Sequence, residues 1–290
     1  MSKTLLEREE DHPQEIVLER GVRRVVTMDS ARYTDARNMD RDVVVAASYL
    51  GVLPARMIAM HRPRAVIGHD ACIGRSGAGI QGLPYLEALG IPAAAVDGMS
   101  AELGNGLDMW ETGCISRVNV LAEQCGVRRG MSVREAAELL LMVEPTDVEV
   151  GHKIRREVVE ESQTGRKVVI TDSIVFADPD IDGRNVLVTA GHTGRSGADF
   201  LLAVSPWGFI CSDGGRGKND AGIAGLAITE RHGLAGCTVD AQTAEIGDAF
   251  SSYYDGVISA CNEPARRRGV HVGQTARDAA HCLLQEDSDV

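Results

Sequence analysis

The chain carries one sequence pattern twice, and this repeat constrains the fold more than any other feature. When the 290-residue sequence is shifted by 143 positions against itself, residues 68–119 fall on residues 211–262 without a gap. Roughly a third of the paired positions are identical, far above the level of two unrelated stretches. We infer a tandem duplication, so the chain should fold as two similar halves related by a pseudo-twofold axis.

Within each half, short apolar runs alternate with segments of helical spacing. Residues 42–47 and 65–68 are apolar runs of the kind that parallel sheets bury, and helical segments closed by glycine follow such runs. This alternation predicts an α/β fold, a tandem duplication of a βα half-unit with a largely parallel sheet or sheets flanked by helices. The sequence leaves open whether the halves share one sheet.

The predicted organisation has five segments. A charged lead-in, interpreted as an amphipathic helix or an arm onto a neighbouring subunit, precedes the first repeat, and a charged linker with helical potential separates the repeats. Residues 114–124 and 257–268 are predicted as helices. The boundaries are 1–22 for the N-terminal arm, 23–145 for the first repeat, 146–165 for the linker, 166–285 for the second repeat and 286–290 for the tail.

Charge and cysteine content narrow the class of partner. The net charge of −12 at pH 7 argues against nucleic acid or an anionic membrane surface. No apolar run approaches the ~20 residues that cross a bilayer, and the N-terminus is charged where a signal peptide is apolar. Seven cysteines without a Cys-x-x-Cys pair are typical of reduced thiols. We expect a cytoplasmic protein with a small-molecule substrate, and a homo-oligomer because internal duplications often descend from homodimers.

Aspartates follow the predicted strands in both halves. Ligands bind outside the carboxyl ends of parallel strands, where crowded carboxylates bind a cation or hold a proton. An oxygen-rich site with a histidine would suit Mg, Mn or Zn, and Asp213 and Asp240 are the candidate metal ligands. The alternative is that each aspartate caps a helix or forms a turn. The strand-end aspartates are Asp29, Asp70, Asp97, Asp172, Asp213 and Asp240.

Positions that differ between the copies indicate chemistry more strongly, because scaffold residues should be kept in both. His192 stands where the first half has Tyr49, and Lys218 where it has Arg75. The second half therefore collects groups that can act as acid, base or ligand. The candidate substrate-binding residues are His69, Arg75, Asp220 and Asp248.

The candidate catalytic residues are His192, Lys218, Asp172 and Ser173. In this hypothesis His192 helps to bind a metal or position water, Asp172 orients His192, and Lys218 stabilises a developing oxyanion. Ser173 is a nucleophile if the fold brings Lys218 close enough to activate it. A capping hydroxyl explains Ser173, and its counterpart Ser30, equally well.

Two glycine-rich turns indicate a weaker alternative, phosphate binding. Residues 191–197 follow a strand, so backbone N–H groups could hold an anion there, but the spacing is not that of a dinucleotide-binding turn. Residues 212–219 depart from a P-loop at both ends, since Ser212 replaces its first glycine and Asn219 its magnesium-binding Ser or Thr.

Three functions are compatible with these observations. The first is hydrolysis of an amide or other C–N bond of a polar metabolite, at strand ends near the junction of the repeats, with a divalent metal as the one cofactor considered. The second is a phosphate- or nucleotide-binding enzyme that uses the glycine turns. The third is a non-catalytic binding or assembly protein. We favour the first, because unmatched polar groups at strand ends are costly unless they are used.

Overall fold

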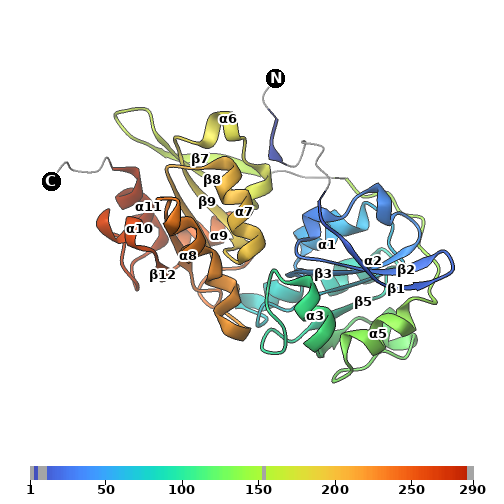
Figure 1. Cartoon of the computed structure of the whole chain (residues 1–290). Coiled ribbons are helices and arrows are strands. Elements are labelled where there is room, and N and C mark those ends of the chain that lie inside the picture. The colour runs from blue at the N-terminus through green and yellow to red at the C-terminus, as the bar shows by residue number, and fades with distance from the viewer. Residues whose placement is uncertain (1–2, 6–11, 152–154, 286–290) are drawn as a thin grey trace.

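The computed structural model describes residues 3–5, 12–151 and 155–285, and it places them in two similar lobes (Figure 1). Each lobe is built on its own six-stranded, mostly parallel sheet. The expected α/β class and the two-half arrangement are confirmed, and the halves do not share a sheet. Below, the first half is residues 12–151 and the second half is residues 155–285.

The first sheet follows the chain in strict order, β1-β2-β3-β4-β5-β6. Its four inner strands are parallel, and both edge strands are antiparallel to their neighbours. The strands are β1 (Glu15–Arg20), β2 (Arg23–Met28), β3 (Asp42–Tyr49), β4 (Ala65–His69), β5 (Ala93–Val96) and β6 (Ile115–Val118).

The second sheet repeats this plan, with the same sequential order and the same antiparallel edges. Its inner strands carry the Val- and Ile-rich runs that a sheet covered on both faces requires. The strands are β7 (Arg156–Glu161), β8 (Lys167–Thr171), β9 (Val186–His192), β10 (Gly208–Ser212), β11 (Ala235–Val239) and β12 (Ile258–Cys261).

Helices cover both faces of each sheet, because successive strand residues point to opposite sides. In the first half, Val43 and Val45 pack with the core beneath α3 and α5, whereas Val44 and Ala46 pack with the core beneath α1 and α2. The helices of the first half are α1 (Val52–Ala59), α2 (Gly82–Ala88), α3 (Gly106–Thr112), α4 (Val120–Gln124) and α5 (Val133–Leu140). Those of the second half are α6 (Pro179–Asp182), α7 (Arg195–Val204), α8 (Ala224–Arg231), α9 (Ala249–Tyr254), α10 (Glu263–Arg267) and α11 (Ala276–Leu284).

Short 3-10 helices follow several of the strands. They form because a capping serine or a sharp glycine turn interrupts the chain directly after the strand. These segments are η2 (Ala31–Tyr33), η3 (Ala36–Asn38), η4 (Arg75–Ile80), η5 (Ile174–Phe176) and η6 (Lys218–Ile223).

Three expectations about local structure are corrected. Part of the N-terminal arm is strand β1, and part of the linker is strand β7. The segments 114–124 and 257–268 each begin with an antiparallel edge strand and only then continue as a short helix. The rest of the arm at residues 1–2 and 6–11, and the tail at 286–290, lie outside the described residues.

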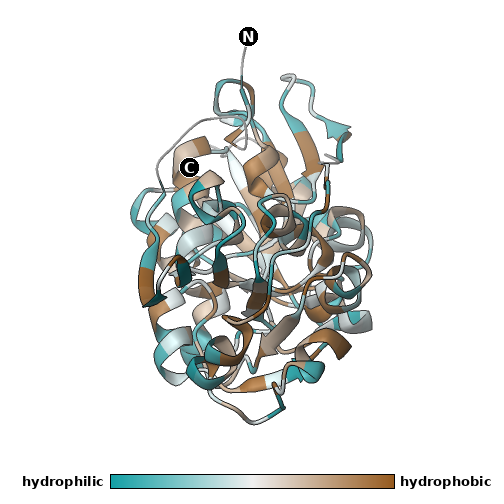
Figure 2. Ribbon diagram, turned by 90° about the vertical axis from the view of Figure 1, so that its right-hand side faces the viewer, coloured by the Kyte–Doolittle hydropathy of each residue, from teal (hydrophilic) through white to brown (hydrophobic). Residues whose placement is uncertain are grey.

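The halves face each other through the helices that follow β3 and β9. Met57 of α1 belongs to an apolar core of the second half, and Phe200 of α7 packs on cores of both halves. Hydrophobic residues run through the interior strands, and hydrophilic ones concentrate on outer helices and loops (Figure 2). Within the described residues, no helix is both long enough and apolar enough to span a membrane.

Candidate functional site

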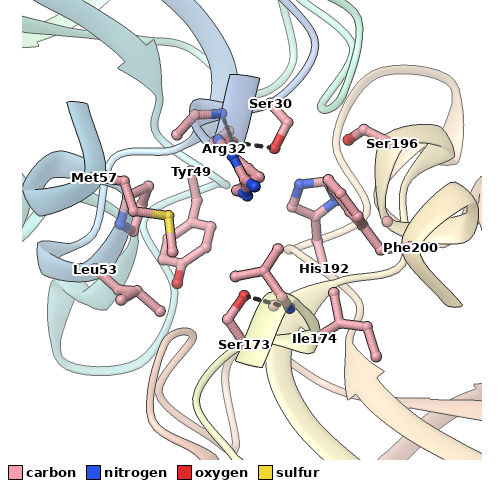
Figure 3. Close-up of a pocket in the computed structure, with 16 residues that line it drawn as sticks. Ser30, Arg32, Tyr49, Leu53, Met57, Ser173, Ile174, His192, Ser196 and Phe200 are labelled. Carbon is pink, nitrogen blue, oxygen red and sulfur yellow. Dashed lines mark hydrogen bonds between the residues drawn. The ribbon is translucent and has the colours of Figure 1, made fainter. Parts of the chain in front are cut away.

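A cavity of about 60 Å³ lies between the halves, and both contribute equally to its lining (Figure 3). Every lining position in the first half has a counterpart 143 residues later that also lines the cavity. The pseudo-twofold axis therefore passes through the cavity. The first half contributes positions 30–32, 48–49, 53–54 and 57, and the second half contributes 173–175, 191–192, 196–197 and 200.

His192 reaches this cavity from the end of β9, as expected of a strand-end residue (Figure 3). Its Nδ1 accepts a hydrogen bond from the Gly194 N–H at 3.0 Å, so the ring proton sits on Nε2. Burial, helped by nearby His69, lowers the pKa of His192 to about 4. At neutral pH the side chain is therefore an uncharged hydrogen-bond donor.

Tyr49 occupies the matching position at the end of β3, and its ring points into the same cavity (Figure 3). The residue is only 5% exposed, and its hydroxyl has no hydrogen-bond partner within the described part of the chain. Burial, followed by the charge of Asp172, raises the pKa of Tyr49, so the phenol keeps its proton.

Ser196, in the first turn of α7, is the third polar group of this kind. It is 4% exposed, and its hydroxyl has no partner among residues 3–5, 12–151 and 155–285. A nearly buried polar group without a partner costs free energy unless water or a ligand satisfies it. The cavity thus offers three polar groups to an occupant, the nearly buried hydroxyls of Tyr49 and Ser196 and the Nε2–H of the half-buried His192.

Ser173 also lines the cavity, but its hydroxyl oxygen is used locally. It accepts from the Val175 N–H at 3.4 Å and caps η5, and Ser30 does the same for η2 by accepting from Arg32 at 3.2 Å. The capping alternative therefore describes both residues, and each hydroxyl proton remains available to donate into the cavity.

Lys218 is not part of the cavity lining; it holds the two halves together. Its Nζ donates to both carboxylate oxygens of Asp108, at 2.6 and 2.9 Å, and to the Thr112 hydroxyl at 3.0 Å. Burial opposes the ionisation of Asp108, but the bonds from Lys218 and the Glu102 N–H, together with the charge of Lys218, lower the pKa of this carboxyl. The expected oxyanion role and the pairing with Ser173 have no support from this position.

Arg75 is the counterpart of Lys218 and makes the equivalent contact in the opposite direction. Its backbone N–H donates to Ala241 at 2.7 Å, and that of Lys218 donates to Gly98 at 2.8 Å. The Arg75 guanidinium pairs with Asp255 at 3.0 Å and also donates to the Thr243 carbonyl. Arg75 is therefore an interface residue, outside the cavity lining.

Asp172 does not orient His192. Its carboxylate accepts two bonds from Arg155, at 2.8 and 2.7 Å, and one from the Ala249 N–H at 3.1 Å. Asp248 caps α9 and shares Arg155 at 3.0 Å. These two expected site residues fix the start of α9 against the sheet.

The two candidate metal ligands are engaged by the backbone. One oxygen of Asp213 accepts from the Gly215 and Ala241 N–H groups at 2.9 and 3.0 Å, and Asp240 accepts from Gln242 at 2.8 Å. Burial raises the pKa of Asp213. Across the described ranges, no three His, Cys, Asp or Glu side chains are grouped so that they could hold a metal ion.

The remaining expected residues are also distributed away from the cavity lining. His69 is fully buried, with Nδ1 accepting from Ala71 and Nε2 donating to the Ala101 carbonyl, both at 3.0 Å. Burial lowers its pKa. Asp220 is exposed and pairs with Arg216 at 3.5 Å.

The central backbone donors of the P-loop-like turn are already engaged. The N–H groups of residues 214–218 all donate to acceptors within the protein. By contrast, the turn at 191–197 contributes Gly191 and Gly197 to the cavity wall.

Sequence reasoning missed Tyr49, Ser196 and Arg32 as site residues. All three line the cavity, and each differs from its counterpart in the other copy: His192, Leu53 and Val175 respectively. A difference between the copies was thus the useful signal, but it had to be applied to the residues of both halves.

Comparison of the chain with protein-family models, curated proteins and solved structures gives no match.

Proposed function

We propose that the protein binds a small carbonyl compound in the cavity between its halves and hydrolyses it at an amide or other C–N bond. The observation that carries the proposal is a set of polar groups with no partner among the described residues, the hydroxyls of Tyr49 and Ser196 and the Nε2–H of His192, around one cavity between the halves. A bound molecule with a polarised oxygen would satisfy them.

The protonation states of the two aromatic donors support a role at a carbonyl oxygen. His192 is neutral with its proton on Nε2, and Tyr49 keeps its phenolic proton at neutral pH. Donors aimed at an oxygen that gains negative charge lower the barrier to addition at the carbonyl carbon. In hydrolysis, water adds to that carbon, the carbonyl electrons move to the oxygen, and the amine leaves with a proton.

The composition of the lining favours non-catalytic binding as the second candidate. None of the sixteen described residues that line the cavity is Asp or Glu, and the free electron pair of His192 is occupied by Gly194. The cavity therefore supplies donors and no evident general base. The same donors would hold a carbonyl compound without converting it.

The test is a panel of small amides, with released amine measured for the wild type, Tyr49→Phe and His192→Gln. We expect each variant to lose on the order of 10²-fold in kcat, the effect of removing one oxyanion donor. Arg195→Gln is the matched control, because Arg195 is exposed beside the cavity and does not line it. Amides that raise the melting temperature without turnover would favour the binding protein. Neither binding nor turnover would refute both.

Three further expectations from the sequence belong to this proposal. A homo-oligomer would be seen by sedimentation of the full chain, and a cytoplasmic location by cell fractionation. A divalent metal would be found by metal analysis of protein purified without chelator, beside its melting temperature with and without EDTA.

A further inference from the structure

We propose that the ligand of the cavity is a small carboxylate whose acid group is held by Arg32, an inference that rests on the proposed function in taking this cavity as the binding site. The carbonyl or amide group of the same molecule then lies at Tyr49 and His192.

The charge of the cavity opposes that of the protein as a whole. The chain has a net charge of −12, yet Arg32 is the one charged side chain among the sixteen described lining residues once His192 is neutral. Arg32 lies above the centre of the cavity, with Tyr49 and His192 on either side (Figure 3). One of its Nη groups donates to the Leu5 carbonyl at 3.1 Å, which fixes the side chain at this place. An arginine fork matches the geometry of a carboxylate.

Helix α7 adds a favourable field for an anion. It begins at the cavity, where Ser196 and Gly197 of its first turn form part of the wall, and its N-cap Gly194 provides no side-chain cap. The first-turn N–H groups carry the positive end of the helix dipole. Ser196 provides a hydroxyl at the same place that lacks a partner in the described structure, so the site does not depend on the dipole alone.

Size and polarity limit the ligand further. The cavity is small, about 60 Å³, and it is open on one side, so it admits a short molecule that can extend toward its mouth. Leu53 and Met57 of the first half and Phe200 on the opposite side give the wall apolar surfaces on both sides (Figure 3). A short organic monoanion fits both properties, whereas inorganic phosphate would place most of its charge against these apolar side chains.

The experiment measures binding of four probes to the full chain by calorimetry: 2-oxobutyrate, butyrate, butyramide and inorganic phosphate. We expect 2-oxobutyrate to bind most tightly, because it offers both the carboxylate and the carbonyl group. The affinity for butyrate should be about tenfold or more above that for butyramide, because only butyrate forms a charge-assisted hydrogen bond with Arg32. Arg32→Gln should remove this preference, Arg32→Lys should keep part of it, and Arg195→Gln, outside the lining, should leave it unchanged.

The outcomes separate this inference from the function on which it rests. Equal binding of butyrate and butyramide, with no effect of Arg32→Gln and a loss in Tyr49→Phe, would refute the carboxylate and keep the cavity as the site. Tighter binding of phosphate than of butyrate would also refute the carboxylate. Binding of none of the organic probes would overturn both proposals.

Discussion

Asp70 in the first half and Asp213 in the second half make the same hydrogen bonds, whereas Tyr49 and His192, which also share one position of the repeat, make different ones. One oxygen of each aspartate accepts from two backbone N–H groups, Cys72 and Gly98 in one copy and Gly215 and Ala241 in the other. In the cavity, His192 accepts from Gly194, and Tyr49 has no partner in the described structure.

The asparagines at 119 and 262 extend the comparison. Each caps a helix and accepts from an N–H group at the start of a neighbouring strand, that of Ala93 in one half and that of Gly236 in the other. Identity between the copies therefore marks side chains that hold the backbone. Differences in the cavity mark side chains that face its interior. Four measurements would test this division.

The largest effect is expected where the copies agree. Asp213→Ala leaves two buried N–H groups without an acceptor, so the free energy of unfolding should fall by about 3 kcal/mol or more in urea titrations. Asp213→Asn keeps an acceptor oxygen and should lose less than about 1 kcal/mol. Equal losses in the two variants would show that the charge, and not the backbone bonds, is what both copies retain.

Acid should destabilise the fold through His192 and not through its counterpart. In the folded protein the pKa of His192 is about 4, below the unfolded value near 6.5. Between these two values only the unfolded chain takes up the proton. The contribution of His192 to the free energy of unfolding is therefore complete above pH 6.5 and is lost as the pH falls toward 4. The loss is at most about 3 kcal/mol. In unfolding titrations at pH 7 and 4.5, His192→Gln should lose less stability than the wild type, and Tyr49→Phe should lose as much. The same loss in His192→Gln would contradict the assignment.

The two cross-half ion pairs should differ in strength. Arg75 of the first half pairs with Asp255 of the second half. The counterpart of Asp255 in the first half is Thr112, which has no charge. Lys218 instead pairs with Asp108, one helical turn before Thr112. The Lys218–Asp108 side chains are 24% and 19% exposed, against 40% and 45% for Arg75–Asp255. Double-mutant cycles with Met and Asn substitutions should give a coupling of about 1–2 kcal/mol for the first pair and below about 1 kcal/mol for the second. The reverse order would show that exposure does not decide the difference.

The smallest change in stability is expected at Tyr49. Tyr49→Phe removes a hydroxyl without a partner in the described structure, so the free energy of unfolding should stay within about 0.5 kcal/mol of the wild type while ligand binding is lost. Thermal unfolding with and without 2-oxobutyrate measures both. A destabilisation above about 1 kcal/mol would mean that the hydroxyl is bonded within the protein.

The repeat and the apolar runs were sufficient to predict the fold class and most inner strands. The edge strands were not predicted, because β6 and β12 are only four residues long and are read as the start of the helices that follow them. β1 and β7 were missed because edge strands exposed to solvent carry charged residues, and their composition is that of an arm or a linker.

The lining of the cavity was predicted only in part. His192 and Ser173 line the cavity, but Lys218, Arg75 and the aspartates do not. Spacing along the chain cannot show whether a strand-end carboxylate is consumed by N–H groups 28 residues away, as Asp213 is by Ala241. It also cannot show that positions 143 residues apart meet at one axis, which is how Tyr49 and Arg32 enter the site.

A binding site on the symmetry axis of identical subunits offers an unsymmetrical ligand two equal orientations, and every substitution there appears twice. Fusion of the two copies into one chain removes both restrictions. Here Arg32 is matched by Val175, and Tyr49 by His192, so the two ends of the cavity differ in chemistry. If the proposed ligand binds, discrimination between its two ends depends on the covalent link between the halves, and two separately expressed halves could retain it only by pairing with each other and not with themselves.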